Sequence, residues 1–78
     1  MYMEFLFTTN LSVDEKEVVY EVHFDNEKYT FMPGENDNQL APFSFKREHD
    51  EWQDQDPISA PLKKQAINAL ENYLLAQH

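Results

Sequence analysis

The segment that most constrains the fold of this chain is residues 56–77, the only stretch whose sequence predicts a long amphipathic helix. At about 100° per residue, its apolar side chains fall within one half of the helix circumference. They are Leu62, Ala66, Ala69, Leu70, Tyr73, Leu74 and Ala76. Ser59 is a good N-cap because its hydroxyl can accept from a free amide, and proline at position 61 is tolerated in a first turn. We expect a helix at about residues 60–76.

The rest of the chain predicts β-strands, because short β-branched and aromatic runs alternate with polar residues. We expect strands at about residues 3–9, 18–25, 28–32 and 43–48, with a fifth at 51–54 left open. A sheet needs one face covered, and the helix is the only cover that the sequence offers. The predicted fold is therefore α+β: one domain, residues 1–78, with an antiparallel sheet of three to five strands and a C-terminal helix on one face.

A hairpin at residues 24–29 is the best-defined pairing. With Asn26 and Glu27 at the tip, Phe24 lies opposite Tyr29 and on the same face as Tyr20. Turn and hydrophobic pattern therefore agree on one register. The predicted core combines the helix stripe with one face of each strand: Phe5, Phe7, Tyr20, Val22, Phe24, Phe31, Phe43 and Phe45.

Two connections leave local questions. Residues 10–17 link the first two strands, and Ser12 to Glu15 fits a capping box, so a helix or a single helical turn at residues 12–16 competes with strand. A turn at residues 49–50 sets Trp52 opposite Arg47, where the indole can close one end of the core or stack under the guanidinium.

The composition excludes several classes of function. Fifteen acidic residues against six basic ones give a net charge of −9, which argues against binding to nucleic-acid phosphates or anionic membranes. The chain has no cysteine, no apolar run of the roughly 20 residues that a membrane helix needs, and no basic n-region typical of a signal peptide. We expect a cytoplasmic protein.

The chemistry-bearing residues show no catalytic pattern. His23, His49 and His78 lack metal-ligand spacing, and the acidic loop at residues 35–38 lacks the glycine placement of a calcium loop. No serine lies in a nucleophile motif, and one glycine cannot build a phosphate loop. Lys63 and Lys64 lie in the first helical turns, where we expect them to pair with nearby aspartates. We therefore expect no enzyme, no cofactor and no metal.

The remaining lead is the sheet face opposite the helix, which one helix cannot cover. The residues that we expect there as a partner-binding surface are Tyr2, Leu6, Val19, Glu21, His23 and Met32. The leading hypothesis is a small acidic protein-interaction or regulatory module that binds a protein, or a second copy of itself, through this face or a strand edge. Two alternatives stay open: an acidic mimic of nucleic acid that occupies a basic protein, and a cation-dependent or catalytic domain built from converging histidines and acids.

Overall fold

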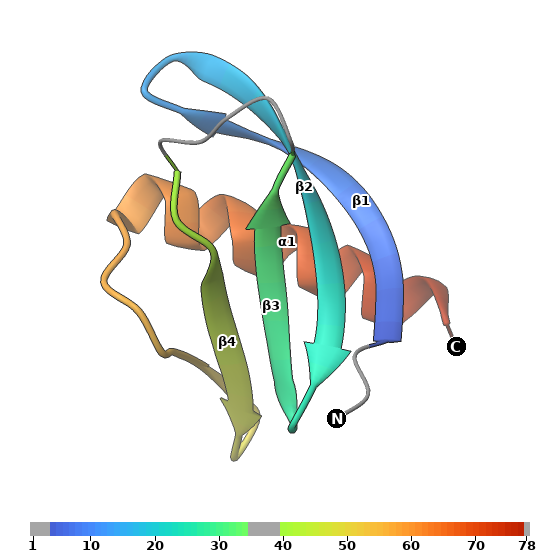
Figure 1. Cartoon of the computed structure of the whole chain (residues 1–78). Helices are drawn as coiled ribbons and strands as arrows, with labels where there is room; N and C mark the ends of the chain where they lie inside the picture. Colours follow the sequence, from blue (N-terminus) through green and yellow to red (C-terminus); the bar gives the residue numbers. More distant parts are fainter. Residues whose placement is uncertain (1–3, 35–39, 78) are drawn as a thin grey trace.

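The computed structural model describes residues 4–34 and 40–77, which form one five-stranded antiparallel sheet and one helix (Figure 1). The elements are β1 (Glu4–Val13), β2 (Lys16–Asp25), β3 (Lys28–Pro33), β4 (Phe43–Glu48), β5 (Glu51–Asp54) and α1 (Ala60–Ala76). Neighbours in the chain are neighbours in the sheet, in the order β1-β2-β3-β4-β5. The predicted α+β class is confirmed, and the sheet is a simple meander.

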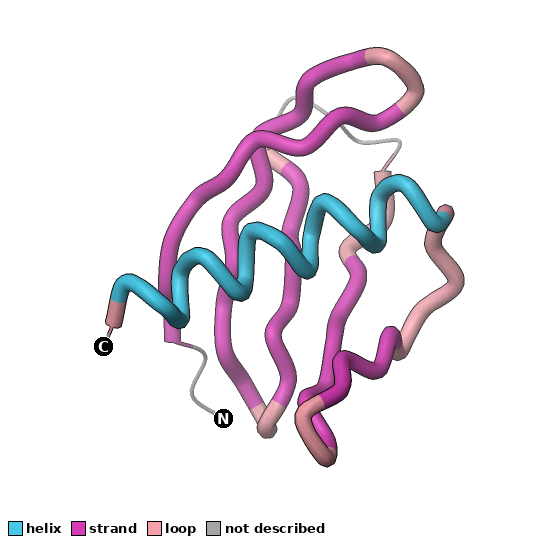
Figure 2. Tube along the Cα trace, turned by 180° about the vertical axis from the view of Figure 1, so that it is seen from behind, coloured by secondary structure: helices cyan, strands magenta, loops and turns pink. Residues whose placement is uncertain are grey.

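Helix α1 lies against one face of the sheet and crosses the strands from the side of β4 to the side of β1 (Figure 2). It begins where the capping signal indicates: the Ser59 hydroxyl accepts a hydrogen bond from the Leu62 amide at 3.4 Å. Ala66 and Leu70, both in the predicted stripe, are completely buried against the strands. The amphipathic helix is thus the cover for the sheet.

The core between helix and sheet is largely aromatic. The rings of Phe31 and Phe43 stack at 5.0 Å between centroids, and Phe45 meets both edge-on. Phe7 stacks on Tyr73 of α1 at 4.6 Å, which joins β1 to the helix. Each large apolar side chain buried in this way stabilises the fold by about 1.5–3 kcal/mol before the cost of ordering it.

All three tight hairpins use two-residue turns in the left-handed backbone region. Both central residues have positive φ in each turn: Asp14 and Glu15, Asn26 and Glu27, and His49 and Asp50, with values from 50° to 67°. This is the pattern of a type I′ turn, whose twist matches that of the flanking strands. Glycine is the residue best suited to such a conformation, yet none of the three turns contains one.

The first hairpin corrects our expectation for residues 10–17. This segment is neither an open connection nor a helical turn, because β1 continues to Val13, β2 begins at Lys16, and only two residues form the turn. The reason is burial: the outer part of the hairpin brings Leu11 and Val18 into the core as a facing pair. A helical turn there would remove both side chains from that pairing.

A β-bulge near the start of β1 corrects a second expectation. Phe7 pairs with Val22 and Phe5 pairs with His23, so Leu6 is an extra residue between the two pairs. One extra residue reverses the alternation of side chains between the two faces. Phe5 is therefore 53 % exposed and not a core residue, whereas Leu6 packs against the core and not on the opposite face.

Side chains satisfy the backbone at both margins of the sheet. The Ser12 amide donates to Gln65 Oε1 at 2.8 Å, and Gln65 Nε2 donates back to the Ser12 carbonyl at 3.0 Å. On the other side, the Ser44 amide donates to Asp56 Oδ2 and the Ser44 carbonyl accepts from the Gln55 amide, both at 2.9 Å. These contacts tie the helix and its leading segment to the strands.

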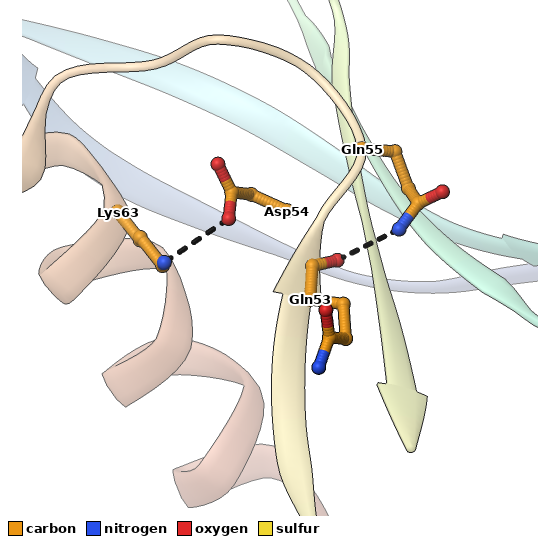
Figure 3. Close-up of polar contacts among 4 residues, drawn as sticks. All are labelled: Gln53, Asp54, Gln55 and Lys63. Atoms are coloured by element: carbon orange, nitrogen blue, oxygen red, sulfur yellow. Dashed lines mark hydrogen bonds and ion pairs between the residues drawn. The ribbon is translucent and has the colours of Figure 1, made fainter.

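An exposed ion pair joins β5 to the first turn of α1, as expected for Lys63, whereas Lys64 forms no ion pair with a described residue. Lys63 Nζ lies 3.0 Å from Asp54 Oδ1 (Figure 3). The hydrogen bond from Lys63, together with a backbone hydrogen bond, lowers the pKa of Asp54 below its ordinary value of 3.8. Because the pair is open to solvent, it directs the chain into the helix more than it stabilises the fold.

Candidate protein-binding face

The surface of the sheet turned away from α1 is the candidate functional site, and we call it the open face. It consists of the outward residues of the first four strands: Phe5, Thr8, Asn10, Ser12, Glu17, Val19, Glu21, His23, Asp25, Lys28, Thr30, Met32, Ser44, Lys46 and Glu48. These positions follow from the strand register, since residues paired across an antiparallel sheet point to the same side.

Large apolar side chains surround one carboxylate on this face. Phe5, Val19 and Met32 are 53 %, 51 % and 37 % exposed, and they come from three neighbouring strands. Met32 pairs directly with Glu21, Val19 lies two residues before Glu21 on β2, and His23 lies two residues after it. Thr8 lies opposite Glu21 on β1, so the carboxylate has apolar or aromatic neighbours on its other sides, and we call these neighbours the apolar ring.

Local contacts fix the orientation of this ring. His23 Nε2 lies 3.2 Å from Glu21 Oε1, and the imidazole meets the ring of Phe5 edge-on at 5.5 Å. Only 15 % of the His23 side chain is exposed, compared with 55 % for Glu21. The histidine is therefore packed against its neighbours, and the carboxylate is the more solvent-exposed of the two side chains.

The structure brings together four of the six residues that the sequence assigned to a partner face, and they are Val19, Glu21, His23 and Met32. Tyr2 lies outside the described residues. Leu6 does not belong to the face because the bulge turns it toward the core, and Phe5 takes its place. Strict alternation along β1 puts Phe5 on the core face together with Phe7, so the sequence pattern did not indicate that Phe5 is exposed. Its discovery needed the register of β1 on β2.

The histidines and acids do not converge within the described part of the chain. No group of three or more His, Asp and Glu side chains placed to hold a metal ion occurs there. His23 lies on the open face and His49 in the turn between β4 and β5. His78 and the acidic loop at residues 35–38 lie outside the described residues.

Comparison with known proteins adds no relationship: no family model, curated protein or solved structure matches this chain. Within residues 4–34 and 40–77, the structure contains no helix long and apolar enough to cross a membrane. Any functional proposal must therefore come from the surface itself.

Proposed function

We propose that this protein is a non-enzymatic protein-binding module whose open face binds a basic segment of another protein. The observation that supports this proposal is the ring of exposed Phe5, Val19 and Met32 around Glu21. Binding energy in protein interfaces comes mainly from a few apolar or aromatic groups that lose water in the centre of the contact. The open face has such groups on three adjacent strands.

Charge favours a basic partner over other classes. Glu21 is flanked by apolar side chains, so it suits a lysine or arginine whose aliphatic stem covers those side chains while its charged end reaches the carboxylate. The net charge of −9 speeds the approach of a basic partner and opposes association of two copies of this chain.

The test is affinity capture from lysate with the immobilised full chain, followed by titration of the purified captured protein. Val19→Asp and Glu21→Lys should abolish binding, and added NaCl should weaken the wild-type complex because it screens the charges. Backbone chemical shifts check that both variants remain folded.

Each variant has a matched control away from the apolar ring. Leu75→Asp makes the same kind of change as Val19→Asp on the helix, where Leu75 is 72 % exposed. Glu51→Lys makes the same charge change as Glu21→Lys on β5. Both controls should bind like the wild type. Equal binding by all four variants, or capture of an acidic protein only, would exclude the open face as the site.

A further inference from the structure

A second surface with ligand-binding chemistry lies on the helix side of the sheet, away from the open face. A cleft of about 520 Å³ opens between the end of β4 and the C-terminal half of α1, lined by Arg47, Glu71, Leu74 and Leu75. Sites for small molecules commonly measure about 300–1,000 Å³ and combine apolar walls with a few polar groups. This cleft has two leucine walls, one cation and one anion.

The cation in this cleft has no anionic partner among the described residues. Arg47 is the only arginine of the chain, and no carboxylate in the described residues forms an ion pair with it, although the chain has fifteen acidic residues. Its guanidinium instead lies over the ring of Trp52, 4.8 Å from the centroid. Stacking leaves the N–H groups at the guanidinium edge free to donate to a planar carboxylate.

The indole beneath it also has an unused donor. Trp52 Nε1 is buried and has no hydrogen-bond acceptor among the described residues. Buried donors without an acceptor are rare in folded proteins. The Arg47 guanidinium and the Trp52 indole N–H are therefore two adjacent donors without a hydrogen-bond acceptor among the described residues.

We propose that this cleft binds a small zwitterion with an apolar side chain, of which a free α-amino acid such as leucine is the simplest example. Its carboxylate would accept hydrogen bonds from Arg47, its ammonium would donate to Glu71, and its side chain would cover Leu74 and Leu75. A zwitterion also avoids the long-range repulsion that a net charge of −9 exerts on a free anion.

The probes for the test separate the three parts of this ligand. The full chain is titrated with leucine, with leucinamide, which lacks the carboxylate, with N-acetyl-leucine, which lacks the ammonium, and with glycine, which lacks the side chain. Trp52 is the only tryptophan and lies beneath Arg47, so its fluorescence and its indole N–H resonance report on changes at this residue of the cleft. Leucine should give a saturable change in both signals. The affinity of each of the other three compounds should be lower than that of leucine by about tenfold or more.

Variants assign each contact. Arg47→Gln should weaken leucine binding about tenfold and remove the preference for leucine over leucinamide, whereas Glu71→Gln should remove the preference over N-acetyl-leucine. Leu75→Ala should weaken leucine and leave glycine unchanged, and it should not disturb the fold because Leu75 is exposed. Lys46→Gln and Glu51→Gln make the same charge changes outside the cleft and should bind leucine normally.

Three results would overturn the proposal. They are the absence of a saturable change with leucine, equal binding of all four probes, and unchanged leucine binding by both Arg47→Gln and Leu75→Ala. Tighter binding of N-acetyl-leucine than of leucine would also overturn it, because the site would then be one for simple anions. None of these outcomes depends on the open face, since the cleft lies on the other side of the sheet.

Discussion

The two faces of the sheet are made by the same strands but differ in burial and in the side chains that they carry. On β2, Val22 is completely buried under the helix, while Val19, three residues earlier on the opposite face, is 51 % exposed. The covered face holds the core, and the buried side chains that the structure describes there are all aliphatic or aromatic. The open face alternates apolar side chains with carboxylates, hydroxyls and a histidine.

The two faces also differ in what they contribute to the stability of the fold. The polar contacts on the open face, such as Asn10 to Glu17 at 2.9 Å and Thr30 to Ser44 at 3.0 Å, are exposed or only partly buried. Contacts of this kind contribute little to the free energy of unfolding. The stability of the fold therefore depends mainly on the covered face, and the proposed binding surface is the face that contributes less to it.

The largest expected effect tests the covered face through the helix. Leu70→Ala removes a completely buried side chain and should lower the free energy of unfolding by about 2–5 kcal/mol, which urea denaturation measures. That is a large share of the total for so small a domain. Leu75→Ala, on the same helix but 72 % exposed, should change it by less than about 0.5 kcal/mol. Similar midpoints for the two variants would mean that another side of α1 faces the sheet.

The bulge in β1 gives the next effect and the sharpest test of which residue belongs to which face. Leu6→Asp places a charge against the core and should cost about 1–3 kcal/mol, whereas Phe5→Asp lies on the open face and should leave the fold intact. Thermal melts of the two variants decide the point. The opposite order would show that β1 alternates without a bulge.

A smaller effect tests how the helix holds the margin of the sheet. Gln65→Ala removes both hydrogen bonds to the Ser12 backbone and should cost about 1–2 kcal/mol, at about 0.5–1 kcal/mol for each of these exposed bonds. Amide hydrogen exchange at Ser12 should become faster. Lys64→Ala, the exposed neighbour on the helix, is the control and should have almost no effect. Unchanged exchange at Ser12 would contradict the contact.

The smallest predicted effect is a gain in stability at the turn between β2 and β3, which sets the register of these two strands and so the face on which each side chain lies. Glu27→Gly relieves a left-handed residue with φ of 64° and creates an Asn-Gly turn, so it should stabilise the fold by about 0.5–1 kcal/mol. A glycine introduced within a strand, as in Thr8→Gly, should instead destabilise the fold by a similar amount. A lower melting temperature for Glu27→Gly would contradict the left-handed turn.

Local pattern was enough for the elements whose partners lie close in the sequence. The helix at residues 60–76, the strands at 43–48 and 51–54, and the hairpin tip at Asn26 and Glu27 all agree with the structure. The stacking of Arg47 on Trp52 also follows from a short turn between neighbouring strands. Periodicity and turn length determine these features because only a few residues separate the interacting groups.

What the sequence by itself determined is therefore the α+β class, the apolar side of the helix and most of the open face. Only the tertiary structure decided that Leu6 packs inward and Phe5 outward, that Gln65 binds Ser12 across 53 positions, and that Arg47 meets Glu71 and Leu75 at one cleft. None of these has a local signal. A bulge forms where the shifted side chains pack well against the neighbouring strand and the helix. A contact between residues far apart in the sequence forms only when the fold brings the two segments together.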